Sequence, residues 1–126
     1  MNGLVIGVMT GTSLDAIDIA LLQIIKNLPF KLVDFHSKKI PQKLKGEIKS
    51  LATLNITNIR TLAKVTNIFS REIANNINAF LKKNGYKSKI IVCGVHGQTI
   101  AHSPQDGFSF QICNPHLIAE LTGLRV

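Results

Sequence analysis

The stretch GVMTGTSLDAID, residues 7–18, contains the residue types whose spacing best suits phosphate chemistry. Its polar side chains after the glycine at position 11 are Thr12, Ser13, Asp15 and Asp18. Gly11 lacks the side chain that would block a phosphate, and the two hydroxyls that follow add hydrogen-bond donors. The two carboxylates suit a hydrated divalent cation that bridges phosphates. An ordinary hairpin turn uses the same residue types, so spacing alone leaves both interpretations open.

A second polar cluster follows the apolar run 89–93 and contains His96, Gln98, Thr99 and His102. Ligands of open α/β sheets bind where strands end, so His96 between two glycines could reach one. The same imidazole could instead hydrogen-bond the backbone of a tight turn. His96 and His102 lack a third ligand nearby, so the sequence predicts no zinc site. Ser13 and His96 lack a nucleophile elbow, which argues against a hydrolase.

The composition indicates one globular domain without a membrane span or an export leader. Of the 126 residues 45% are hydrophobic and 17% are charged, which argues against disorder. Cys93 and Cys113 form no CxxC pair, so we expect reduced thiols in a cytoplasmic protein. The net charge of +8 could attract nucleic acid, but one Tyr and no Trp leave no platform for base stacking. The surplus charge favours solubility and a mild attraction for anionic ligands.

The order of patterns along the chain predicts an α/β fold that opens with a three-stranded antiparallel meander at residues 3–9, 16–26 and 30–39. A short helix follows Pro41, and a long one runs from a cap at Thr57 or Asn58 to Asn84-Gly85. Residues 89–93 predict a strand buried on both faces. Residues 100–107 predict a loop, 108–112 a strand, and Asn114 the cap of a short helix. The last residues, 124–126, resemble the start of another strand.

Three stretches in order along the chain resemble anhydro-N-acetylmuramic acid kinases: residues 7–18, residues 94–104 (GVHGQTIAHSP), and FQICN with TGLRV near the end. The resemblance implies the N-terminal half of an actin, sugar-kinase and Hsp70-like ATPase domain, here incomplete over residues 1–126. It also implies a reaction with ATP and Mg²⁺ in peptidoglycan recycling. In that reaction water opens 1,6-anhydro-N-acetylmuramic acid while O6 takes the γ-phosphoryl group, giving N-acetylmuramic acid 6-phosphate.

The resemblance also implies roles for particular residues. The ATP-contacting loop would be Gly11, Thr12, Ser13, Leu14, Asp15, Ala16, Ile17 and Asp18, and the sugar side of the cleft would carry His96, Gln98 and Thr99. Ala16 and Cys113 stand where the family usually has glycine. A side chain at these two positions is tolerated only where φ is negative. The family's general base, in an Asp-Phe-Arg motif, and its second domain would lie beyond these residues.

Three hypotheses therefore remain. The chain is the N-terminal piece of a split kinase that pairs with a separate C-terminal polypeptide, a remnant without catalysis, or a small basic module that binds nucleotide or nucleic acid. Under the first two we expect no turnover by the chain alone.

Overall fold

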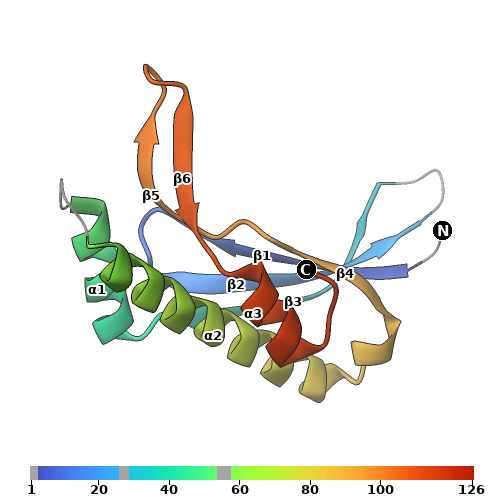
Figure 1. Ribbon diagram of the computed structural model, residues 1–126. Coiled ribbons are helices and arrows are strands. Elements are labelled where there is room, and N and C mark those ends of the chain that lie inside the picture. Colours follow the sequence, from blue (N-terminus) through green and yellow to red (C-terminus); the bar gives the residue numbers. More distant parts are fainter. Residues whose placement is uncertain (1–2, 26–28, 54–57) are drawn as a thin grey trace.

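The computed structural model describes residues 3–25, 29–53 and 58–126, which form a mixed α/β fold (Figure 1). The elements, in chain order, are β1 (Gly3–Thr10), β2 (Ala16–Ile24), β3 (Lys31–Lys39), α1 (Gln42–Thr53), α2 (Ile59–Asn84), a 3-10 turn (Lys87–Lys89), β4 (Ile90–Val95), β5 (Gln98–Ser103), β6 (Phe108–Ile112) and α3 (Pro115–Thr122). The α/β class, the opening meander and the long helix are confirmed.

The main sheet has the strand order β3-β2-β1-β4. Strand β2 is antiparallel to both β1 and β3, whereas β4 runs parallel to β1 with Gly94 opposite Gly7. On the outer edge of β4 the Cys93 N–H donates to the carbonyl of Arg125 at 2.8 Å. Residues 124–126, all of them described, have no strand assignment, but this bond places them beside β4 as a further strand would lie.

The loop predicted at 100–107 is confirmed for residues 104–107 and wrong for residues 100–103. Residues 98–103 are β5, which pairs with β6 in a hairpin that stands away from the body (Figure 1). The loop is only the tip between the two strands, where the Gly107 N–H donates to the Pro104 carbonyl at 3.2 Å. Ala101 and His102 are both exposed. The predicted strand at 108–112 is confirmed as β6, whereas the sequence of β5 lacks the apolar alternation that identifies a half-buried strand.

The apolar core lies between one face of the sheet and the helices. Alternate residues of β1 and β2 point into it and meet the apolar stripe of α2: Ile6, Val8, Ile17, Ile19, Leu21, Phe69, Ile73 and Ile77. The ends of α2 are fixed as predicted, since the Asn58 side chain accepts from the Arg60 N–H and Gly85 takes the left-handed conformation. Residue 57, the alternative cap, lies outside the described residues.

The opposite face of the sheet carries apolar side chains that no described helix covers. Met9 and Leu32 are each 57% exposed and Phe35 is 53% exposed. Val92 of β4 is 36% exposed. The expectation that residues 89–93 are buried on both faces is therefore wrong for the described chain. The run of apolar residues is suited to a covered strand, but the described helices lie on one side (Figure 1).

Candidate functional site

The connection between β1 and β2 is a tight, exposed turn. The Leu14 N–H donates to the Gly11 carbonyl at 3.0 Å, and Leu14 has a φ of 55°. Such left-handed backbone is strained for a leucine. The Leu14 side chain is 4% exposed, and its burial holds the residue in this conformation. Thr12 and Ser13 are exposed at the apex. The turn therefore has a buried anchor and presents its hydroxyls to solvent.

The rest of the predicted ATP loop belongs to β2. Ile17 is buried in the core, whereas Asp18 lies opposite Met9 on the uncovered face. Among the described non-glycine residues only Leu14 has a positive φ, so Ala16 and Cys113 sit in backbone that a side chain tolerates. The two departures from the glycines of the family pattern thus cause no backbone strain.

Asp15 is tied to α1. Its carboxylate Oδ1 accepts from the Lys45 ammonium at 2.6 Å, and its backbone carbonyl accepts from the Ile40 N–H at 3.1 Å. The hydrogen bond from Lys45, then one from Ser13, then the charge of Lys45, hold the pKa of Asp15 below its ordinary 3.8. Sequence reasoning missed Lys45, because 30 residues separate the partners and only the fold brings them together.

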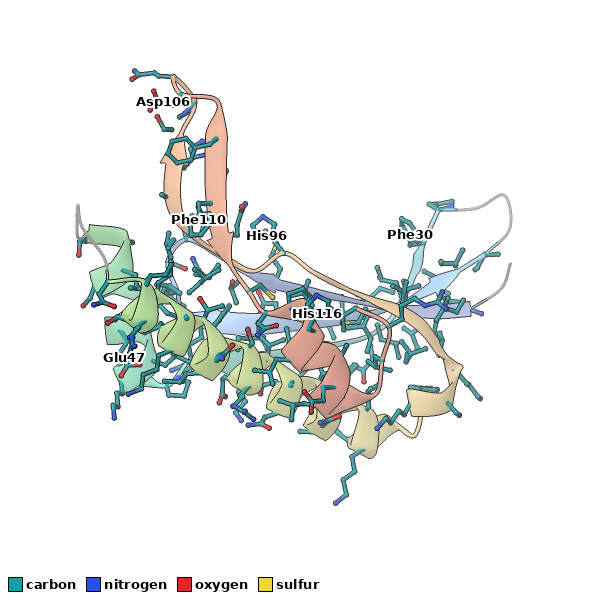
Figure 2. The ribbon with its side chains drawn as sticks, viewed as in Figure 1. Phe30, Glu47, His96, Asp106, Phe110 and His116 are labelled. Atoms are coloured by element: carbon teal, nitrogen blue, oxygen red, sulfur yellow. The ribbon has the colours of Figure 1, made fainter. Side chains whose placement is uncertain are left out.

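His96 and Asp18 line one hollow of about 620 Å³ on the uncovered face. Gly7 and Gly94 form part of its floor, where the absence of side chains leaves the backbone accessible. Figure 2 shows His96 on the side of the sheet away from the helices. Its Nδ1 lies 3.1 Å from the Gly97 carbonyl oxygen, and because that oxygen only accepts, the hydrogen bond forms when the proton is on Nδ1. The local backbone bond considered from the sequence is therefore present, and the ring still lines the hollow.

The two predicted clusters meet at the base of the hairpin. The buried Thr10 hydroxyl, at the end of β1, donates to the Gly97 carbonyl at 2.9 Å across 87 residues of sequence. Gly97 has a φ of +79°, and an added Cβ would lie 2.9 Å from the Ile112 carbonyl oxygen. The segment that follows β4 is thus clamped between β1 and β6. This clamp fixes His96 relative to the turn at residues 11–15.

Gln98 and Thr99 differ from His96 in their surroundings. Gln98 is 1% exposed, and its Nε2 donates to the Thr99 carbonyl at 3.2 Å. Its Oε1 is buried and has no hydrogen-bond partner within the described residues. A buried acceptor without a donor is unfavourable, so this oxygen retains the capacity to accept a hydrogen bond. Thr99 is half-buried and His102 is exposed on the hairpin.

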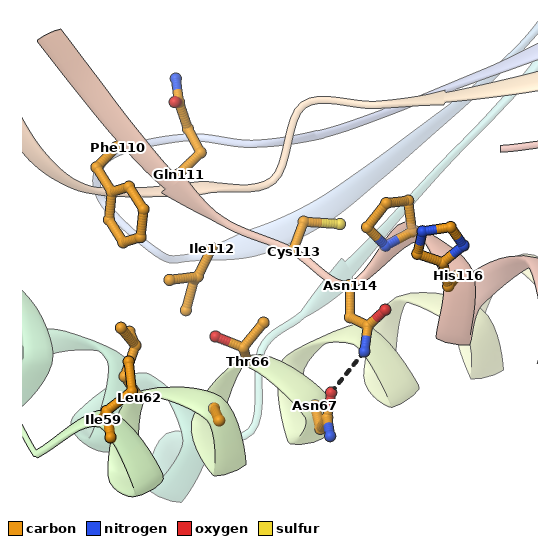
Figure 3. A pocket seen from close by; sticks show the side chains of 12 residues that line it. Ile59, Leu62, Thr66, Asn67, Phe110, Gln111, Ile112, Cys113, Asn114 and His116 are labelled. Atoms are coloured by element: carbon orange, nitrogen blue, oxygen red, sulfur yellow. Dashed lines mark hydrogen bonds between the residues drawn. The ribbon is translucent and has the colours of Figure 1, made fainter.

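An apolar groove of about 570 Å³ lies beneath the hairpin, between β6, α2 and the start of α3. Figure 3 shows Phe110 and Ile112 on its α2 side, with Gln111 pointing away. Asn114 accepts from the Leu117 N–H at 3.1 Å and donates to Asn67 at 2.9 Å, which confirms the predicted cap. Both ends of the Asn114 amide therefore have partners, which leaves it little freedom to bind a sugar.

The two cysteines are free thiols. Burial, with a smaller contribution from Cys113, raises the pKa of Cys93 to about 12. Burial also raises the pKa of Cys113, against a hydrogen bond from Ser70. Both thiols stay protonated near neutral pH and are poor nucleophiles. Within the described residues no group of three His, Cys, Asp or Glu side chains has the arrangement of a metal site.

Comparison with known proteins gives consistent matches along the chain. A family model described as anhydro-N-acetylmuramic acid kinase matches residues 3–126. Curated relatives with that name include one from Pseudomonas putida, 38% identical over 98% of this chain and 34% of the relative. One from Nitrosospira multiformis is 37% identical over 96% of this chain and 34% of the relative. One from Mannheimia succiniciproducens is 38% identical over 94% of this chain and 32% of the relative. The chain thus spans about a third of the length of the curated relatives it matches.

Proposed function

The chain belongs to the anhydro-N-acetylmuramic acid kinase family, and on that premise we propose that it forms the part of such a kinase that holds the phosphates of ATP and one wall of the sugar site. The substrates proposed are ATP and 1,6-anhydro-N-acetylmuramic acid, and the product is N-acetylmuramic acid 6-phosphate. A reaction that consumes ATP belongs in the cytoplasm. Among the described helices none has the length and apolarity of a membrane span.

The exposed turn at residues 11–15 is the observation that carries this proposal. Within the described chain neither Thr12 nor Ser13 donates its backbone N–H to a backbone carbonyl. The Thr12 hydroxyl is exposed, whereas the Ser13 hydroxyl already bonds to Asp15. Backbone N–H groups gathered at a turn that contains a left-handed residue suit phosphate oxygens. Burial of Leu14 holds these donors in place before a ligand arrives, and preorganised donors are what phosphoryl transfer requires.

Few side chains at this turn could bind Mg²⁺ directly. Asp15 is paired with Lys45, whereas the half-buried Asp18 carboxylate makes no ion pair within the described residues. Magnesium usually keeps several waters and binds one or two carboxylates together with substrate phosphates. Asp18 is the carboxylate free to take that role. When bound, the ion would neutralise charge on the phosphates.

The sugar wall is assigned to the segment that follows β4. His96 offers an exposed imidazole nitrogen in the hollow that it shares with Asp18. The unused Oε1 of Gln98 and the half-buried Thr99 hydroxyl are further groups for sugar hydroxyls. The Thr10–Gly97 bond keeps this wall at a fixed position relative to the phosphate turn. The reaction also needs a base that accepts the proton of the attacking water, and we assign that base to the remaining two thirds of the family's length.

The uncovered face of the sheet is where we place the packing of that remainder, supplied as a separate polypeptide. Replacing Phe35 by Ser is expected to weaken this association by roughly tenfold, because an aromatic side chain loses its burial on binding. The stability of the chain itself should change by less than about 1 kcal/mol, since Phe35 is 53% exposed. Titration calorimetry of the two polypeptides measures the effect. Phe108→Ser, on the hairpin and 49% exposed, is the matched control, and an equal loss there would contradict the assignment.

Binding of Mg·ATP to this chain tests the phosphate turn. Thr12→Val keeps the shape of the side chain and removes the hydroxyl, so it is expected to weaken binding by roughly tenfold through one lost bond to a charged ligand. Thr61→Val makes the same change at an exposed position in the first turn of α2 and is expected to have no effect. Isothermal titration calorimetry reports both.

Three outcomes of this titration would count against the proposal. Equal affinities of wild type and Thr12→Val for Mg·ATP would show that the turn is not part of the binding site. Absence of binding by wild type at millimolar Mg·ATP would favour a remnant. Salt-sensitive binding of DNA that ATP does not displace would favour the basic module.

A further inference from the structure

The ion pair between Asp15 and Lys45 differs from an ordinary surface pair in its geometry. The Lys45 side chain is 18% exposed and that of Asp15 is 70% exposed, and their charged atoms lie 2.6 Å apart. The other ion pair found in the described residues, Lys38–Glu72, is 3.9 Å long. A mostly buried lysine stem leaves its ammonium few alternative positions, so the cation is the fixed partner and the carboxylate is the one that is held.

The pair connects the phosphate turn to the start of α1. Lys45 lies in the first turn of that helix, where its own N–H donates to the Pro41 carbonyl at 2.9 Å. Asp15 is bound to this region twice, through its carboxylate to Lys45 and through its backbone carbonyl to Ile40. Leu14, immediately before it, has strained backbone. A strained residue persists only where its surroundings determine its conformation, and Lys45 supplies one of those restraints.

We propose that Lys45 is a positioning residue. It holds the Asp15 carboxylate, and through it the turn from Gly11 to Asp15, in the conformation that presents Thr12 and the backbone N–H groups to phosphate oxygens. This inference rests on the proposed function, in which that turn contacts ATP.

The test compares Lys45→Met with Lys45→Arg, which keeps the charge, and with Lys49→Met, which removes an equal charge one turn further along α1. Amide hydrogen exchange at Leu14, whose N–H donates to the Gly11 carbonyl, is expected to accelerate several-fold in Lys45→Met alone, at an unchanged melting temperature. Mg·ATP affinity is expected to fall by roughly three- to fivefold in the same variant, as for loss of an exposed ion pair. Lys45→Arg should restore both.

Titration of the Asp15 carboxyl carbon gives a readout that a merely structural role would not move. A lowered pKa in the folded state means that the pair contributes fully above the ordinary value of 3.8 and is lost as the pH falls through the lowered value. In Lys45→Met the carboxyl should titrate closer to 3.8, and the protection of the Leu14 amide relative to its intrinsic exchange rate should no longer change with pH in that range.

The outcomes separate this inference from the proposed function. Unchanged exchange and an unchanged Asp15 titration in Lys45→Met would overturn the role of Lys45, even where wild type binds Mg·ATP. Failure of wild type to bind Mg·ATP would overturn the proposed function, while the exchange and titration data would still decide whether Lys45 holds the turn. Asp15→Asn, which weakens the pair from its other side, should accelerate exchange at Leu14 in the same way if Lys45→Met proves unstable.

Discussion

Mixed with a polypeptide that supplies the remaining two thirds of a family member, the chain is expected to convert ATP and 1,6-anhydro-N-acetylmuramic acid into a phosphorylated sugar. Either polypeptide alone is expected to be at least about a thousandfold slower, because a general base and preorganised charge each contribute factors of this size. The described residues supply the exposed turn and the wall around His96, and the proposal places the base elsewhere. Transfer of labelled γ-phosphate to the sugar measures the rate.

Variants of the chain identify the source of any activity in the mixture. Thr12→Val should lower the rate of the mixture, and Thr61→Val should leave it unchanged. Turnover by the 126-residue chain alone would contradict the division of labour proposed here. A mixture that remains inactive although the two polypeptides associate would point to a remnant.

Gly97→Ala is expected to destabilise the fold by about 3 kcal/mol or more, through left-handed strain and overpacking together. The new Cβ would lie 2.9 Å from the Ile112 carbonyl oxygen and 3.2 Å from the Cys113 Cβ, and neither neighbour is a flexible chain end. Relief requires Gly97 and β6 to move apart at the base of the hairpin, where the Thr10 hydroxyl also holds the Gly97 carbonyl. Urea denaturation followed by circular dichroism gives the free energy of unfolding.

Gly107→Ala provides the matched control for this change. Gly107 also has left-handed backbone, with a φ of +73°, but nothing lies within 4 Å of its added Cβ. Its replacement should cost only the backbone strain, about 1 kcal/mol. Equal losses for the two variants would show that the contacts of Gly97 with β6 do not fix the hairpin base.

Local patterns were sufficient to predict the elements that hold the site. The opening meander, the 26-residue α2 and its caps at Asn58 and Gly85 follow from apolar spacing and from short-range capping chemistry. The position of Thr12 and Ser13 in an exposed turn follows from glycine and hydroxyl residues between two apolar runs. The alternation of Phe108, Phe110 and Ile112 was sufficient to predict β6, whereas β5 and its pairing with β6 were not predictable, because β5 projects into solvent and has no such alternation.

Contacts between distant residues account for what sequence reasoning missed in the site. The Asp15–Lys45 and Thr10–Gly97 bonds span 30 and 87 residues, and neither leaves a local signal. The burial of Gln98 depends on how the hairpin base packs on the body. The left-handed Leu14 was also unexpected, because leucine rarely adopts that conformation unless burial of its side chain offsets the strain.

Nuclear magnetic resonance of the ¹⁵N-labelled chain during titration with Mg·ATP locates the nucleotide on the chain. If the turn holds the phosphates, the largest shifts occur at the amides of Gly11, Thr12 and Ser13, with smaller ones at Asp18 and His96. Shifts confined to the lysine-rich helix ends, or to the groove beneath the hairpin, would contradict this role of the turn.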